Sequence, residues 1–197
     1  MIEFKKNVKK ILPYDRGQYI EFLDDDFDSS INWYGVSFQI NKEGQKISLT
    51  EFVETYEPLF RNIISTLDNG SFWIVNHEDK DLDWFPNDEN NLTSLRALFK
   101  QREIPNTYRG ALVLKKEELL NLSKDLISYP CALLYKDALL YKNVDISHAE
   151  LQFIVKISGH LTIDLLSTDK ILLRKIISEN TLSPFVVKEY RRTSLGL

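Results

Sequence analysis

Six acidic residues and two large aromatic rings fall within the fifteen residues 77–91. The acids stand on both sides of the adjacent Trp84 and Phe85, and Pro86 follows them directly. Carboxylates steer cationic partners toward a surface, and large rings add affinity where they fill a pocket of the partner. The segment therefore predicts recognition of a basic protein surface. Its candidate partner-binding residues are Asp79, Asp81, Asp83, Trp84, Phe85, Asp88 and Glu89.

A second acidic cluster lies near the start of the chain, after a group of lysines. Charge runs of this kind usually form a solvated face of the protein. A cationic partner would be attracted to the cluster for the same Coulombic reason, so it is a second candidate surface. Its residues are Asp24, Asp25, Asp26 and Asp28.

The acids of residues 77–91 have only part of the spacing of a calcium loop. Asp79, Asp81 and Asp83 alternate as the first ligands of an EF-hand do. However, Trp84 stands where a glycine makes the sharp turn, and Asn90 stands where a bidentate glutamate is needed. The histidines do not form a pair at the spacing of a zinc motif. We therefore expect no metal site and no cofactor.

The sequence holds no recognisable catalytic signature. With only 7 glycines, it has neither a nucleotide-binding glycine loop nor a Gly-x-Ser-x-Gly elbow. Cys131, the only cysteine, follows Pro130 in an apolar run where desolvation disfavours the thiolate. His160 and Asp164 would lie about 13 Å apart along a strand, too far for an acid/base pair. We therefore expect a protein that is not an enzyme.

Size and composition indicate one ordered domain covering residues 1–197, of which 43% are hydrophobic. The net charge of −4 and the pI near 5.5 argue against a general nucleic-acid-binding role. A single cysteine permits no intrachain disulfide. No apolar run approaches the roughly 18 to 20 residues of a membrane span. These features predict a cytoplasmic protein that does not enter a membrane.

Strands and helices alternate along the first half of the chain, whereas the second half contains consecutive strands. This order predicts an α+β fold with a mixed or antiparallel sheet and about four helices. The expected helices are 48–67, with a kink or break at Pro58, 92–103, 117–128 and 168–179, the last capped by Thr168. The expected strands are 17–23, 31–40, 71–76, 111–114 and 185–190. Hairpins are expected for 131–135 with 138–141 and for 151–157 with 161–166, with a helix as the alternative for 151–157.

The acidic and aromatic segment favours a non-catalytic protein-binding module. One such class comprises bacterial immunity or inhibitor proteins, which neutralise a basic toxin enzyme by covering its active site. The alternative is a structural or regulatory subunit of a homo- or hetero-oligomer, in which the acidic segment is only a solvated excursion. A small-molecule enzyme that brings His77, Asp81, Asp83 and His160 together is the weakest interpretation, because no spacing supports it. The sequence does not identify the partner or the oligomeric state.

Overall fold

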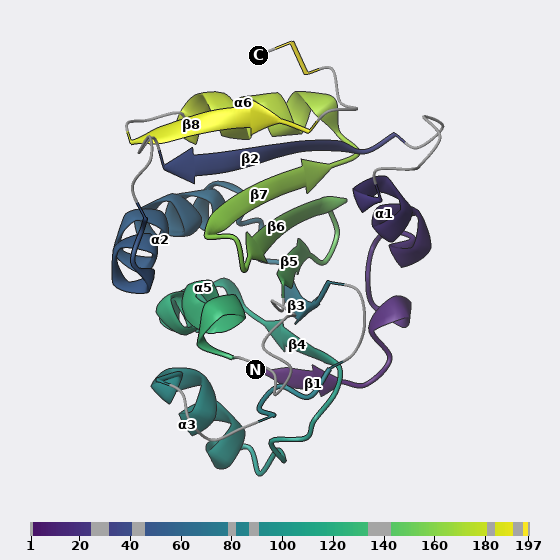
Figure 1. Ribbon diagram of the computed structural model, residues 1–197. Helices are drawn as coiled ribbons and strands as arrows, with labels where there is room; N and C mark the ends of the chain where they lie inside the picture. Colours follow the sequence, from purple (N-terminus) through teal and green to yellow (C-terminus); the bar gives the residue numbers. More distant parts are fainter. Residues whose placement is uncertain are drawn as a thin grey trace.

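One antiparallel sheet of eight strands runs through the described residues, in the order β1-β4-β3-β5-β6-β7-β2-β8 (Figure 1). The computed structural model describes residues 2–24, 32–40, 46–78, 82–86, 91–133, 143–180, 184–190 and 195–196. The strands are β1 (Glu3–Lys5), β2 (Tyr34–Ile40), β3 (Trp73–His77), β4 (Ala111–Leu114), β5 (Val144–His148), β6 (Phe153–Ser158), β7 (Thr162–Ser167) and β8 (Phe185–Glu189). Strands from both halves of the chain therefore belong to a single sheet.

Six α-helices and one 3-10 turn accompany the sheet within the described residues. Figure 1 shows α2, α3 and α5 on one side of the sheet and α1 with the 3-10 turn on the other. The elements are η1 (Val8–Lys10), α1 (Arg16–Leu23), α2 (Leu49–Thr66), α3 (Thr93–Gln101), α4 (Lys116–Asn121), α5 (Ser123–Ala132) and α6 (Lys170–Asn180). The predicted α+β class and the antiparallel sheet are confirmed.

The main core lies between the sheet and helices α2, α3, α5 and α6. α2 shows how the sequence builds this core, because its apolar residues recur every three or four positions and form one stripe. Ser48 begins the helix by accepting a hydrogen bond from the main-chain nitrogen of Glu51 at 3.2 Å. The fully buried side chains of the stripe are Phe52, Tyr56, Phe60, Ile63 and Ile64.

A smaller aromatic cluster covers part of the opposite face of the sheet. Tyr14, Tyr19 and Trp33 are buried there against Ile154 of β6 and Leu166 of β7. The three rings meet at centroid distances of 5.3 to 5.6 Å. The cluster covers β6 and β7 at the end where Ile154 and Leu166 lie. Residues nearer the other end of these strands, on the same face of the sheet, therefore have different neighbours.

Residues 17–23 were expected to form a strand, but they belong to helix α1. Asp15 accepts hydrogen bonds from the main-chain nitrogens of Gly17 at 2.7 Å and Gln18 at 3.3 Å. These bonds satisfy two of the free donors at a helix start, so Asp15 acts as the N-cap of α1. Tyr19 then faces the sheet and is fully buried.

Prolines and caps differ from the expectations in three further places. α2 is not divided at Pro58, which was one of the two expected effects of this proline. Pro58 is exposed, so the carbonyl that loses its donor can be hydrated. The helix expected at 117–128 is two helices, and the second includes Pro130, Cys131 and Ala132. The prediction of a strand at residues 131–135 is therefore wrong at its start, where the chain is helical. Residues 134–142, which hold the rest of this predicted hairpin, lie outside the described residues. In α6, Asp169 and not Thr168 accepts the capping hydrogen bonds.

The expected hairpin of residues 151–157 and 161–166 is confirmed as β6 and β7, which pair antiparallel. Strands β2, β3, β4 and β8 also lie close to their expected positions. β1 and β5 were not expected. Among the described residues, no helix is both long enough and apolar enough to cross a membrane.

Candidate functional site

Trp84 and Phe85 lie in the protein core, with exposed fractions of 0% and 3%. Their main-chain nitrogens donate hydrogen bonds to the carbonyl oxygens of Tyr108 at 3.1 Å and Asn106 at 3.0 Å. The indole nitrogen of Trp84 donates to the carbonyl oxygen of Gly110 at 2.9 Å. The expectation that these two rings are exposed anchors for a partner is therefore wrong. Main-chain pairing with the loop before β4 turns the rings inward.

The two buried rings join a cluster of aromatic side chains that connects β3, α3 and α5. The Trp84 ring centroid lies 4.8 Å from that of His77 and 5.1 Å from that of Tyr129, while the Phe85 and Phe99 centroids are 4.9 Å apart. The Tyr129 hydroxyl donates to the Trp84 carbonyl oxygen at 2.7 Å and lies 3.0 Å from His77 Nε2. We call Trp84 and Phe85 the aromatic pin, because they attach the middle of the acidic segment to the core.

Asp83 is the one proposed acid of residues 77–91 that lies in the described part of the chain. Its carboxylate oxygen Oδ1 is 2.5 Å from Nε of Arg109, and the two side chains are 24% and 66% exposed. Arg96 lies over the Phe85 ring, with its guanidinium carbon 4.3 Å from the centroid. Both contacts stabilise the aromatic pin from the solvent side. The other proposed acids, Asp79, Asp81, Asp88 and Glu89, lie outside the described residues.

The second acidic cluster follows α1. Asp24 is exposed at the C-terminal end of this helix, and its main-chain nitrogen donates to the carbonyl oxygens of Ile20 and Glu21. The remaining members, Asp25, Asp26 and Asp28, lie outside the described residues. The structure therefore places only the first residue of this cluster.

A cleft of about 320 Å³ adjoins Asn91, the last residue of the acidic segment. Leu49 and Val53 of α2 give it an apolar wall, and Glu54 adds a carboxylate. Asp125 of α5 also lines the cleft and accepts a hydrogen bond from the Leu95 main-chain nitrogen at 2.7 Å. Burial raises the pKa of Asp125 above its ordinary value. The remaining lining residues are Thr50, Lys124 and Ser128.

A line of polar side chains crosses the sheet from β3 to β8 on the face where α1 lies. Each member is the register partner of the next, so all of them point to the same face. We call this line the polar row, and its members are Asn76, Asp145, Lys156, Asp164, Ser37 and Lys188. The first five are at most 9% exposed, so ionisable groups here are removed from water.

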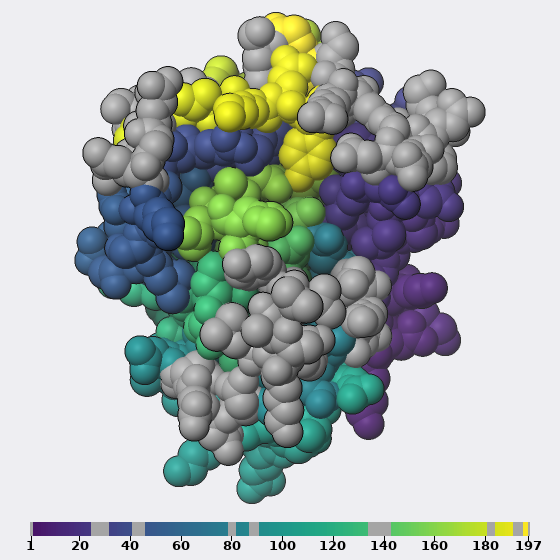
Figure 2. Space-filling view, viewed as in Figure 1, coloured from purple at the N-terminus to yellow at the C-terminus, as the bar shows by residue number. Residues whose placement is uncertain are grey.

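Side chains from neighbouring segments pair with or hydrogen-bond to the charged residues of the polar row. The ammonium group of Lys156 is 2.7 Å from a carboxylate oxygen of Glu78. The hydroxyl of Tyr19 donates to Asp145 at 2.9 Å, and that of Tyr190 donates to Asp164 at 2.7 Å. Figure 2 shows the yellow C-terminal part of the chain above the green middle strands and the purple N-terminal part to their right. Both ends of the chain thus contribute a tyrosine to the polar row.

Burial dominates the ionisation of Asp145. Burial, the largest cause, and the nearby Glu78 carboxylate together raise the pKa of this carboxyl to about 8, against the opposing effects of Lys156, Tyr19 and Arg16. Burial alone would lower the pKa of Lys156, but Glu78 and the other carboxylates outweigh it, so that pKa is raised. Lys156 is therefore a charged residue of the sheet interior, and Asp145 takes up a proton readily.

Of the polar row, sequence reasoning considered only Asp164, and rejected it as an acid/base partner of His160. The available signal was that β5, β6 and β7 each carry one aspartate or lysine between two apolar neighbours. What could not be predicted was the register that aligns these residues. Among the described residues, no group of three or more histidine, cysteine, aspartate or glutamate side chains has an arrangement suited to a metal ion.

Comparisons with known proteins identify no relative of this chain. No protein-family model, no curated protein and no solved structure matches it.

Proposed function

We propose that the protein is a non-catalytic protein-binding module that captures a cationic protein partner with residues 77–91. An inhibitor or immunity protein that covers the basic active site of a toxin enzyme is the form of this function that we favour. The burial of Trp84 and Phe85, at exposed fractions of 0% and 3%, removes these rings as contacts for a partner. The observation that carries the proposal is the six acidic residues gathered within residues 77–91, on both sides of this buried pair. A highly acidic segment is thereby attached to the rigid core in its middle.

Attachment to the core favours binding because it reduces the conformational entropy that a loop loses when it meets its partner. Asp81 precedes Trp84 by three residues in the sequence, and Asp88 follows Phe85 by three. Asp83 itself lies at the surface beside Arg109. Negative charge on both sides of the buried Trp84 and Phe85 provides long-range attraction to a basic surface.

The cleft at Asn91 supplies an apolar contact that the buried rings cannot make. Its aliphatic wall, formed by Leu49 and Val53, lies beside the carboxylate of Glu54. A lysine or arginine side chain of the partner matches this combination, since its stem is aliphatic and its end is cationic. The cleft therefore extends the proposed binding surface from the acidic segment onto α2.

Affinity capture from native cell extract tests this function. The wild-type protein is compared with a variant carrying Asp79→Asn, Asp81→Asn, Asp88→Asn and Glu89→Gln. The matched control neutralises four exposed acids elsewhere, Glu21, Glu103, Glu117 and Glu179, each replaced by glutamine. Both variants lose four negative charges, so a general effect of net charge affects them equally.

We expect the wild-type protein and the control to retain one cationic protein that the segment variant loses. Loss of the same protein in 0.5 M salt is also expected, since salt screens exposed charges. Equal capture by the wild-type protein and the segment variant argues against the proposal. Failure of the wild-type protein to retain any cationic protein argues against it equally.

The outer edge of β8 favours a second candidate function, that of an oligomer subunit. The Tyr190 main-chain nitrogen donates to Gly35 of β2, and antiparallel alternation then directs the main-chain groups of Phe185 and Val187 away from β2. Among the described residues, no strand pairs with this edge. Such an edge can accept a strand from another chain.

Val187→Pro tests the oligomer, because proline there removes an outward-facing donor and should leave pairing with β2 intact. The second candidate predicts a wild-type dimer by light scattering, which Val187→Pro converts to a monomer. A monomeric wild-type protein at all concentrations contradicts it.

A further inference from the structure

His148, the last residue of β5, is a buried histidine that connects two loops at the end of this strand. Its Nδ1 accepts hydrogen bonds from the main-chain nitrogens of Glu150 and Leu151, both at 3.1 Å. A ring nitrogen that accepts hydrogen bonds carries no proton, so the neutral ring has its proton on Nε2. Nε2 therefore donates to Oδ1 of Asn69 at 3.2 Å. The neutral imidazole thus joins the turn after β5 to the connection between α2 and β3.

Asn69 completes the link between the two loops. Its Nδ2 donates to Oε2 of Glu150 at 3.0 Å, and its Oδ1 also accepts from the Ser71 main-chain nitrogen at 3.0 Å. On the sheet side, the ring of Trp73 packs edge-on against that of His148 at a centroid distance of 5.1 Å. His148 is only 1% exposed, so its ring nitrogens depend on these protein partners. We call His148 and Asn69 the histidine latch.

A protonated imidazole cannot keep this arrangement. Protonation places a hydrogen on Nδ1, which then faces two main-chain N–H groups and no longer accepts from them. Burial is the largest influence on the pKa of His148 and lowers it below its ordinary value. The opposing influences on this pKa come from the Glu150 and Asp68 carboxylates and a hydrogen bond with the main chain of Leu67. Asp68 is itself paired with Lys116.

The direction of this pKa shift fixes the pH range in which the latch is closed. A histidine whose folded pKa is lowered stabilises the fold in its neutral form. The stability that the neutral ring contributes is therefore fully present above about pH 6.5 and is lost as the pH falls through the lower pKa of the folded state. Acid should open the latch.

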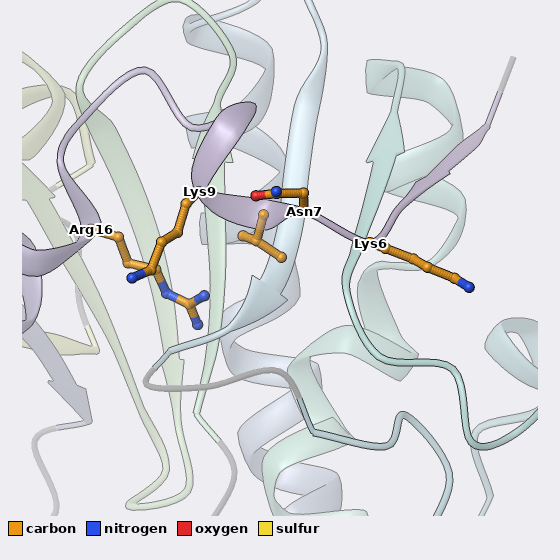
Figure 3. A pocket seen from close by; sticks show the side chains of 5 residues that line it. Lys6, Asn7, Lys9 and Arg16 are labelled. Atoms are coloured by element: carbon orange, nitrogen blue, oxygen red, sulfur yellow. The ribbon is translucent and has the colours of Figure 1, made fainter.

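The turn that the latch holds also contacts the N-terminal segment of the chain. Gln152 Nε2 donates to the Pro13 carbonyl oxygen at 3.2 Å, and Ala149 packs against an apolar cluster that includes part of η1. Figure 3 shows this N-terminal segment from close by, with Lys9 and Arg16, which precede and follow Pro13 in the chain, labelled. Release of the turn should therefore loosen the contact of this segment with the sheet.

We propose that the histidine latch is an acid-sensitive switch, in which proton uptake by His148 releases the turn after β5 from the connection between α2 and β3. The hydrogen bonds carry this inference, because one buried ring nitrogen accepts from two main-chain donors and only the neutral ring can do so. The latch lies at the Trp73 end of β3, whereas residues 77–91 begin at the His77 end. It is therefore separate from the proposed binding surface and does not depend on it.

Amide hydrogen exchange of the full chain, followed by NMR from about pH 7.5 to about pH 4.5, tests the proposal. The rates are corrected for the pH dependence of exchange in an unprotected amide. We expect the protection of the Glu150 and Leu151 amides to fall about tenfold as His148 takes up a proton, as the loss of two neutral hydrogen bonds predicts. Amides in β6 and β7 should keep their protection, which excludes global unfolding. Nitrogen chemical shifts should show the Nε2–H tautomer of His148 at the upper end of the pH range.

His148→Asn is the decisive control variant. An asparagine oxygen can accept from a main-chain nitrogen two residues later and does not titrate, so this variant should keep both amides protected in acid. His160→Gln, which removes an exposed histidine, should behave as the wild type. The proposal is overturned if the wild-type Glu150 and Leu151 amides stay protected over the whole range, or if His148→Asn loses protection as the wild type does. A protonated ring or the Nδ1–H tautomer at the upper end of the range overturns it as well.

Discussion

The hydroxyl of Tyr129 on α5 donates a 2.7 Å hydrogen bond to the main-chain oxygen of Trp84. The two rings also pack at a centroid distance of 5.1 Å. A helix near the middle of the core thus holds the centre of the most acidic stretch of the chain. This relationship changes the role of Trp84 and Phe85 from partner anchors to supports for the charged residues around them.

Removal of the Tyr129 hydroxyl should destabilise the fold. Tyr129→Phe leaves the buried Trp84 carbonyl and His77 Nε2 without this hydroxyl, which should cost about 1 to 3 kcal/mol in the free energy of unfolding. Chemical denaturation measures this change. Tyr34→Phe is the matched control, because the half-buried Tyr34 should lose no more than about 0.5 kcal/mol. Equal effects of the two substitutions contradict the assigned role of Tyr129.

Truncation of the aromatic pin should lower the free energy of unfolding more than removal of the Tyr129 hydroxyl does. Trp84→Ala removes a fully buried ring and the hydrogen bond to Gly110, so we expect a loss of about 3 to 5 kcal/mol in unfolding free energy. Phe72, which is 36% exposed, provides the comparison through Phe72→Ala, with an expected loss near 1 kcal/mol. Thermal and denaturant unfolding measure both. A Trp84→Ala protein as stable as the wild type shows that the ring is not part of the core.

The raised pKa of Asp145 predicts a specific pH dependence of stability. Its carboxyl has an ordinary pKa of 3.8 and a pKa of about 8 in the folded protein, chiefly because it is buried. Between about pH 4 and pH 8 the folded state therefore holds a proton that the unfolded state has released. Stability contributed by this proton is fully present below about pH 4 and is lost as the pH rises through about 8.

Asp145→Asn isolates this effect, since the amide oxygen can still accept the hydrogen bond of Tyr19. The stability of the variant relative to the wild type should increase steadily from pH 4 to pH 8 and then level off. Glu21→Gln, at an exposed position, should show a constant difference over the same range. A pH-independent difference for Asp145→Asn, or one that decreases with pH, contradicts the raised pKa.

Elements with strong local signals could be predicted from the sequence. The capping serine and apolar spacing of α2 identify that helix, and two apolar runs around Gly159 identify the hairpin of β6 and β7. Local patterns were insufficient at Trp84 and Phe85, where acidic neighbours suggested exposure. The contacts that bury these rings come from residues far along the chain, including Asn106 and Tyr129.

The polar row is a second feature that local sequence patterns were insufficient to predict. Asp145, Lys156 and Asp164 each stand between two apolar residues of a strand, so the sequence marks them as unusual. Their alignment depends on the pairing register of three strands, which no local pattern specifies. The tyrosines that hold the carboxylates come from segments near the two ends of the chain, Tyr19 and Tyr190.

The association rate constant for the captured cationic partner tests the proposed function most directly. We expect the wild-type rate to fall about tenfold between roughly 20 mM and 300 mM salt, because screening weakens long-range attraction. The variant with Asn at 79, 81 and 88 and Gln at 89 should associate slowly at low salt and depend little on salt, while the matched control behaves as the wild type. An unchanged association rate of this variant at low salt contradicts charge-guided capture by residues 77–91.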